Sequence, residues 1–222
     1  MATALNRHPI FLFVQFRDTR QIFSRKKSSL NRFMILFGFP FETYKCSLNT
    51  SSIASYCLSY KETNNGRFIS NVGGWQSENL EGKHLVLNDL FLRIEEVSKE
   101  YTFKHGLSSS LQISNIWINI NPPGSFNSVH NHINGYISGV YYVTVPKNSG
   151  NLILTAPDKN ERYMAWMEKN GISNNTLKNN FSYTPVENEI VLFPSWLDHN
   201  VEVNNSLENR ISISFNILSS NS

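Results

Sequence analysis

The sequence predicts a mainly β fold with flanking helices (α+β), in which a double-stranded β-helix, or jelly-roll, of cupin-like shape forms the core. Two observations predict this fold class. Apolar residues recur at helical spacing in the first half of the chain, and their period changes to two from residue 111 onward. Six strand-like runs follow that change. Helices followed by many antiparallel strands favour a β core with helices on its outside.

Two amphipathic helices are expected before the strands. Apolar side chains repeat at helical spacing in residues 51–61, where Ser51 or Ser52 is the expected N-cap. A longer apolar stripe predicts a second helix over residues 86–101. Between them, the Gly-rich residues 69–80 form a loop that is either a structural turn or part of a substrate opening.

The strands are predicted from residues that alternate between apolar and polar. They cover residues 111–120, 138–145, 151–155, 189–193, 199–203 and 210–217. The last strand is the most regular, because Arg210, Ser212, Ser214 and Asn216 share one face and four apolar residues share the other. An entirely polar face on such a strand indicates a barrel whose interior holds a polar ligand.

Composition suggests one domain with a short appendage. The 222 residues carry a net charge of +3, which gives no whole-chain argument for nucleic acid as a partner. Residues 1–33 hold seven basic residues and one acidic residue, a local charge of +6 that leaves −3 for the remainder. We expect residues 1–33 to be a basic tail, disordered or a mis-assigned start or a targeting peptide, and residues 34–222 to be the functional domain.

Hydropathy and cysteine spacing lead to expectations about membrane partners and cellular location. No apolar run is long enough to span a bilayer, so no membrane partner is expected. Cys46 and Cys57 lack metal-ligand spacing and are expected to be reduced thiols in a cytoplasmic protein. Trp75, Trp117 and Trp196 are expected to be packing residues. The sequence does not determine the oligomeric state.

Three histidines and an arginine carry the chemistry. His130 and His132 are two residues apart, so on a strand both would point to the same face. His199 and then Arg210 follow near the C-terminus. Three imidazoles with open positions suit Fe(II), and an arginine can bind a carboxylate with two parallel hydrogen bonds. The order predicts a non-haem iron site beside a 2-oxoglutarate pocket.

Two other functions fit part of this pattern. Two histidines at i and i+2 with a distant third are also typical of a His₃ zinc hydrolase or hydratase. A cupin-like binding module without turnover is the third alternative. Arg210 separates these alternatives, because a zinc hydratase does not need a side chain that holds a dicarboxylate.

Seven segments between about Phe37 and Ile217 resemble a known superfamily. They are LFGFPFETY, SNVGGWQS, WININ, HNH, SGVYYV, FPSWLDH and RISISFNI. Together they are similar to the prolyl-hydroxylase-like branch of the 2-oxoglutarate- and Fe(II)-dependent oxygenases, closest to a small family from bacteria and phages. The resemblance implies a jelly-roll dioxygenase that couples oxidative decarboxylation of 2-oxoglutarate to hydroxylation. Its cofactor would be Fe(II), with 2-oxoglutarate and O₂ as cosubstrates.

The resemblance also implies roles for single residues. His130, His199 and Arg210 match catalytic positions, and His132 stands where most of the superfamily has a carboxylate. Four residues match positions that bind the cosubstrate: Tyr142, Arg210, Ser212 and Asn119, with Asn121 as the alternative to Asn119. His130, His132 and His199 are the expected metal ligands, and Asp198 or water is the alternative third ligand. The substrate is expected to be a small molecule or a protein side chain.

Overall fold

The computed structural model describes residues 32–36, 39–82, 84–107, 111–133, 135–157, 169 and 180–219. The expected basic tail lies outside these residues, apart from residues 32 and 33. Those two begin strand β1 (Arg32–Leu36), so the expected boundary at residue 33 falls inside a strand.

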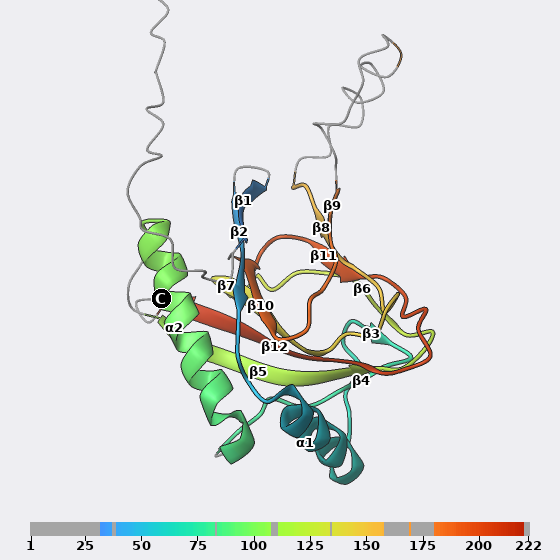
Figure 1. Cartoon of the computed structure of the whole chain (residues 1–222). Coiled ribbons are helices and arrows are strands. Elements are labelled where there is room, and N and C mark those ends of the chain that lie inside the picture. The colour runs from blue at the N-terminus through green and yellow to red at the C-terminus, as the bar shows by residue number, and fades with distance from the viewer. Residues whose placement is uncertain are drawn as a thin grey trace, which may run out of the picture.

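Two antiparallel sheets form the body of the molecule (Figure 1). The major sheet has the order β1, β2 (Phe39–Lys45), β10 (Glu189–Pro194), β7 (Ile137–Thr144), β12 (Arg210–Ser219), β5 (Leu111–Asn121) and β4 (Trp75–Gln76). The minor sheet has the order β3 (Asn71–Val72), β6 (Phe126–His130), β11 (His199–Val201), β8 (Leu152–Thr155) and β9 (Asn180–Tyr183). The predicted fold class is confirmed.

All six predicted strands are present, and their ends differ from the prediction by at most two residues. The sequence patterns missed β1, β2, β3, β4, β6 and β9. Strands β3 and β4 have two residues each, which is too short for an alternating pattern. Strand β6 reads FNSVH and also lacks a clear alternation. Strands β3 and β4 pair with the longer strands β6 and β5, and β6 pairs with both β3 and β11, a tertiary effect that local sequence does not record.

The two predicted helices are present as α1 (Thr50–Thr63) and α2 (Asn88–Lys104), the second preceded by a 3₁₀ turn at Leu85–Leu87. The predicted N-cap of α1 is wrong, because the cap is Asn49. Its side-chain Oδ1 accepts a hydrogen bond from the backbone N–H of Ser52 at 3.1 Å. Asn caps helices as well as Ser does, and it stands one residue before the helix, where a cap belongs.

The helices cover the outer face of the major sheet (Figure 1). Alternation along β5 turns Ile116, Ile118 and Ile120 outward to meet the apolar stripes of α1 and α2. The apolar face of β12 joins the same core. Gly139 of β7 allows close packing there, because a Cβ atom at this position would lie 2.2 Å from Cζ of Phe215. The polar faces of β5 and β12 therefore turn inward, toward the minor sheet.

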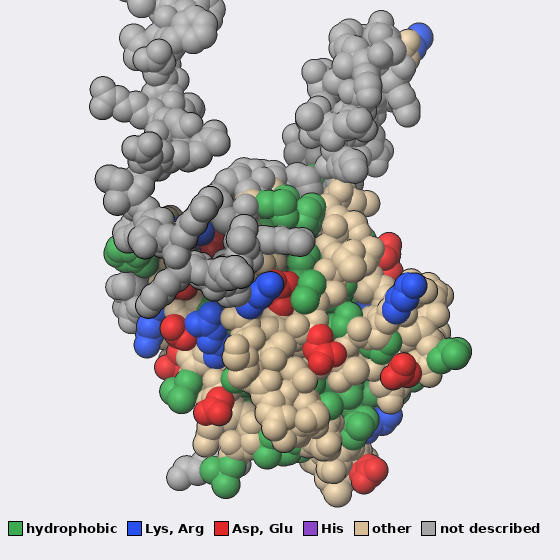
Figure 2. Space-filling model, viewed as in Figure 1, with side chains coloured by type: hydrophobic (Ala, Val, Ile, Leu, Met, Phe, Trp, Pro, Cys, Tyr) green, Lys and Arg blue, Asp and Glu red, His purple; other side chains and the backbone are tan. Residues whose placement is uncertain are grey.

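The surface carries charges of both signs (Figure 2). Figure 2 shows basic and acidic side chains interspersed on one face of the molecule. Neither helix in the described part of the chain has both the length and the hydropathy needed to cross a bilayer.

Candidate metal centre

Three histidines meet between the sheets, and the minor sheet positions two of them. His130 ends β6 and His199 begins β11, and the two residues are direct partners in the antiparallel ladder. The prediction that His130 and His132 share a strand face is wrong, because β6 ends at His130. His132 lies in the following loop, where its backbone N–H donates to the carbonyl oxygen of Ser195 at 2.8 Å.

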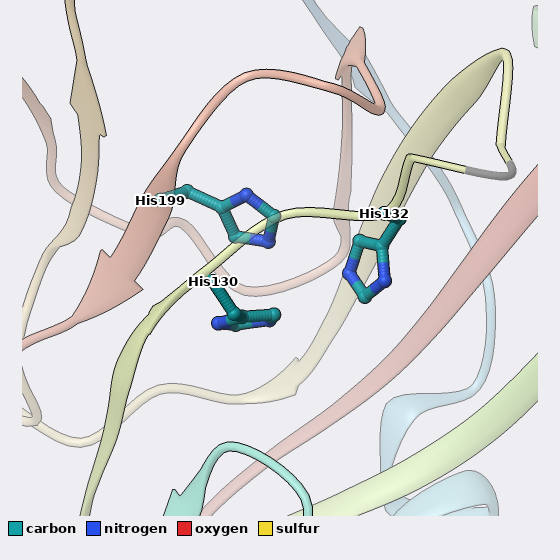
Figure 3. Close-up of side chains that lie close together, drawn as sticks. All are labelled: His130, His132 and His199. Atoms are coloured by element: carbon teal, nitrogen blue, oxygen red, sulfur yellow. The ribbon is translucent and has the colours of Figure 1, made fainter.

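The loop nevertheless brings His132 to the other two rings (Figure 3). One potential ligand nitrogen from each of the three imidazoles lies within 4.8 Å of the others. The ring centroids are 4.3 Å apart for His130 and His199 and 5.2 Å apart for His132 and His199. Within the described residues this is the one cluster of potential metal ligands.

Backbone carbonyls orient two of the rings. Nδ1 of His130 lies 2.8 Å from the carbonyl oxygen of Ser128, and Nδ1 of His199 lies 2.8 Å from that of Leu197. A carbonyl only accepts, so both Nδ1 atoms carry the proton and both Nε2 atoms present a lone pair. Metal-binding histidines in proteins are commonly held in this way.

Burial keeps the three imidazoles neutral. Loss of solvent and the neighbouring His130 ring lower the pKa of His132 to about 4. The same two causes lower the pKa of His199 to about 3. The pKa of His130 is also lowered, chiefly by burial. Neutral imidazole is the form that binds a metal, so the donor set fits a divalent ion at neutral pH.

Asp198 lies outside the cluster. Its Oδ1 accepts a hydrogen bond from Nδ2 of Asn131 at 2.7 Å. The carboxylate therefore ties two loops together beside the histidines.

A cavity of about 60 Å³ adjoins the three histidines. One water molecule needs a cavity of at least about 10–15 Å³. The cavity therefore has room for a few water molecules or a compact ligand. The inward face of β12 supplies Arg210, Ser212, Ser214 and Asn216 to its wall, as the alternation predicted.

Arg210 is the one Lys, Arg, Asp or Glu on the described cavity wall, and its side chain is 2 % exposed. Its guanidinium donates to the carbonyl oxygen of Ser149 at 2.9 Å, and no acidic side chain of the described residues pairs with it. Burial lowers its pKa, while the adjacent Tyr142 phenol tends to raise it. A buried unpaired cation is costly. It is a ready partner for an anionic ligand in the same cavity as the histidines.

Comparison with known families relates the three histidines and Arg210 to one family of enzymes. Residues 115–216 match the sequence profile of the family described as "Putative 2OG-Fe(II) oxygenase". This segment includes the three histidines, Tyr142 and Arg210. It belongs to the 2OG-Fe(II) oxygenase family. The cofactor of this oxygenase is Fe(II), and its cosubstrates are 2-oxoglutarate and O₂.

Solved structures with the same fold include oxygenases of diverse organisms. A prolyl-4-hydroxylase from Pseudomonas putida is 16% identical, with a TM-score of 0.57 over 79% of this chain and 91% of its own. A prolyl hydroxylase from Trichoplax adhaerens, in complex with a hypoxia inducible factor peptide fragment, is 15% identical, with a TM-score of 0.55 over 82% and 84%. HygX from Streptomyces hygroscopicus, with nickel and 2-oxoglutarate bound, is 9% identical, with a TM-score of 0.55 over 81% and 83%. No curated protein sequence matches the chain.

The remaining predicted residues of the oxygenase site lie on one row across the major sheet. Asn119 of β5 is opposite Ser212 of β12, which in turn is opposite Tyr142 of β7. All three line the cavity. Asn119 donates to Ser214 Oγ at 2.9 Å. Asn121 is not on the cavity wall, and its Nδ2 donates to Asn127 Oδ1 at 3.3 Å.

Sequence reasoning missed several residues of the wall, Trp117 and Gln76 among them. Trp117 was expected only to pack, yet it lines the cavity with its ring 5.7 Å from that of His132. Alternation along β5 could have indicated this, since Trp117 shares a face with Asn119. Gln76 continues the row on β4, opposite Asn119. The sequence predicted only that residues 69–80, which include Gln76, form a turn or part of a substrate opening, and the two-residue strand β4 has no pattern that singles Gln76 out.

Proposed function

We propose that this oxygenase hydroxylates a C–H bond of a small molecule or a protein side chain, with His130, His132 and His199 holding the iron. The observation that carries the assignment of the pocket is Arg210, a buried cation without an acidic partner in the cavity that the histidines adjoin. A dicarboxylate that binds the metal at one end can neutralise this cation with the other.

The chain orients the two reactants and excludes water from them. Carbonyl oxygens of Ser128 and Leu197 support the proposed Nε2 ligation by His130 and His199. Arg210 is proposed to hold the far carboxylate of 2-oxoglutarate by charge-assisted hydrogen bonds. Tyr142 and Ser212 have hydroxyls that make no hydrogen bond with described residues, and we propose that they donate to that carboxylate. Asn119 is proposed to contact the same ligand.

Fe(II) supplies the chemistry that consumes 2-oxoglutarate, O₂ and a substrate C–H group and gives succinate, CO₂ and the hydroxylated product. The small cavity limits competing water around these reactants. The donor set differs from the two histidines and one carboxylate of facial-triad iron oxygenases. With three neutral imidazoles the metal keeps its full double positive charge, which favours a doubly anionic cosubstrate.

Location and domain extent are further proposals. Cys46 and Cys57 are free thiols in the structure, which supports a cytoplasmic protein. We propose that the oxygenase domain extends over residues 34–222, with β1 beginning slightly earlier at Arg32.

Thermal unfolding with Mn(II) in place of Fe(II) tests the pocket without requiring turnover. The metal and 2-oxoglutarate together are expected to stabilise the protein by about 2.7 kcal/mol when the cosubstrate is present at 100 times its Kd. Succinate release with Fe(II) and O₂ provides the second measurement. Stabilisation by Zn(II) alone, with no added effect of 2-oxoglutarate and no succinate, would support the zinc alternative instead.

A further inference from the structure

Gln76 is a buried carboxamide that faces the cavity without a protein partner. Its side chain is 4 % exposed and lines the cavity wall, yet it makes no hydrogen bond with any described residue. Its backbone is held firmly, because the carbonyl oxygen accepts from the N–H of Arg67 at 2.8 Å and β4 pairs with β5. The Asn side chains of the wall do have partners: Asn119 donates to Ser214, Asn127 donates to Ser70, and Asn216 accepts from Ser138.

Gln76 and Tyr142 stand at opposite ends of one row, and Asn119 is the proposed cosubstrate contact nearest to Gln76. The row runs from Tyr142 through Ser212 and Asn119 to Gln76. Neighbouring strands are about 4.8 Å apart, so the backbones of Tyr142 and Gln76 are separated by roughly 14 Å. A five-carbon chain with bonds of about 1.5 Å spans only about 6 Å. Gln76 is therefore at the end of the row farthest from Tyr142.

Apolar side chains near Gln76 are exposed, and Arg67, the bridge partner of Gln76, pairs with Glu78 at 3.5 Å. Ile69 lines the cavity but is 68 % exposed, and the adjacent Phe68 is 85 % exposed. On the neighbouring strand β6, Val129 is 62 % exposed. Arg210, the single charged residue of the described wall, lies on β12 at the proposed cosubstrate end. At this end the described cavity wall offers the uncharged carboxamide of Gln76, while the nearby Arg67 is not on the wall and already pairs with Glu78.

We propose that Gln76 is a specificity-determining residue that binds an amide group of the primary substrate. A carboxamide offers one acceptor oxygen and two donor hydrogens, so an amide satisfies it in both directions. A carboxylate or ammonium group satisfies only one of them, and Arg67, the charged bridge partner of Gln76, already pairs with Glu78. The inference rests on the proposed metal and cosubstrate site, since it identifies the substrate end of the same cavity.

Paramagnetic relaxation of a small probe tests the proposal with the full chain. The protein is loaded with Mn(II) and 2-oxoglutarate, and proton relaxation of N-acetylalaninamide is measured as the probe is titrated. We expect saturable relaxation in the wild type, with affinity about tenfold lower in Gln76→Leu, the equivalent of one hydrogen bond of about 1.4 kcal/mol. Gln76→Glu, which keeps the size but loses the donor, is expected to weaken binding as well.

Gln112→Leu is the matched control, because it makes the same change at an exposed position of β5. It is expected to bind the probe as the wild type does. N-Methylacetamide and a capped alanine dipeptide distinguish the source of the amide: equal affinities indicate a small-molecule amide, and tighter binding of the dipeptide indicates a peptide.

Three results would overturn the proposal. The first is no saturable probe relaxation although water relaxation and 2-oxoglutarate titration show both ligands bound. The second is equally strong relaxation of zwitterionic alanine. The third is a loss of 2-oxoglutarate affinity in Gln76→Leu as large as the loss of probe affinity, which would make Gln76 a cosubstrate residue. Failure of Mn(II) or 2-oxoglutarate to bind the wild type would instead refute the proposed function.

Discussion

Two buried charges of the major sheet have opposite surroundings. Glu42 on β2 is 1 % exposed, and Arg210 on β12 is 2 % exposed. The Glu42 carboxylate accepts from the Tyr44 hydroxyl at 2.6 Å, pairs with Lys104 Nζ at 3.0 Å and contacts Nε2 of His105. Arg210 has one hydrogen bond to a backbone carbonyl and no acidic partner among the described residues.

The pKa shifts show the same contrast. Burial tends to raise the pKa of Glu42, but hydrogen bonds from Tyr44, Lys104 and His105 outweigh it and lower the pKa overall. Burial lowers the pKa of Arg210, and only Tyr142 opposes it. The folded chain therefore stabilises the charged form of Glu42 and destabilises that of Arg210. We infer that Glu42 serves the attachment of α2 to the sheet, and that Arg210 serves a ligand.

The largest expected effect is the loss of metal binding. The proposed role of Arg210 depends on the metal, because 2-oxoglutarate is proposed to bind the metal at one end and Arg210 at the other. His132→Ala should sharply lower metal affinity and succinate formation, because one of the three proposed ligands is lost. His132→Asp should retain binding, since two histidines and a carboxylate also hold Fe(II). Metal content and succinate yield are the measurements. Asp198→Asn is the control, expected to have little effect because Asp198 bonds Asn131. Loss of metal in that control, with His132→Ala unaffected, would make Asp198 the third ligand.

Arg210→Met is expected to separate ligand affinity from stability. A charge-assisted hydrogen bond contributes roughly 1.5–3 kcal/mol, so 2-oxoglutarate affinity should fall by about 10- to 150-fold. The unfolding free energy of the ligand-free protein should stay constant or rise, because an unpaired buried charge is removed. Arg210→Lys should lower the affinity by about tenfold or more, since it keeps the charge but loses the planar fork. Calorimetric titration and denaturant unfolding measure the two quantities. Unchanged affinity in both variants would remove Arg210 from the pocket.

Glu42→Gln is expected to show the reverse behaviour. Removing a buried, hydrogen-bonded charge should lower the unfolding free energy by about 2 kcal/mol, because charged donors lose their partner. The affinity for 2-oxoglutarate should be that of the wild type. Denaturant unfolding beside the same titration provides the measurement. A stable variant with impaired cosubstrate binding would contradict the division of roles.

The smallest effect is a pH dependence. The pKa of Glu42 is lowered in the folded state, so its stabilisation is complete above the unfolded pKa of about 4.3 and is lost as pH falls through the lower folded value. The difference in stability between wild type and Glu42→Gln should therefore shrink only below about pH 4. Unfolding curves between acidic and neutral pH measure it. If the stability difference already disappeared near neutral pH, the pH dependence would belong to a group other than Glu42.

The sequence predicted those site residues that lie on long strands with regular alternation of polar and apolar side chains. Alternation along β12 predicted the four polar side chains of that strand that line the cavity, because ten paired residues keep one face inward. Register across strands was not predictable, and it decides that Gln76 joins the row. His132 was placed on a strand because its spacing fits one. The backbone bond to Ser195, 63 positions away in sequence, sets its place instead.

The direct pairing of His130 with His199 has a mechanical consequence. These residues are 69 positions apart in sequence, and their strands share a short ladder that is interrupted by a register shift after His199. An ion bound by both rings would be a cross-link that closes this long loop. The entropy cost of loop closure grows only slowly with loop length, so a single cross-link can hold the two ends of the intervening segment together. The metal would then stabilise the pairing of β6 with β11 in the minor sheet in addition to serving as the cofactor.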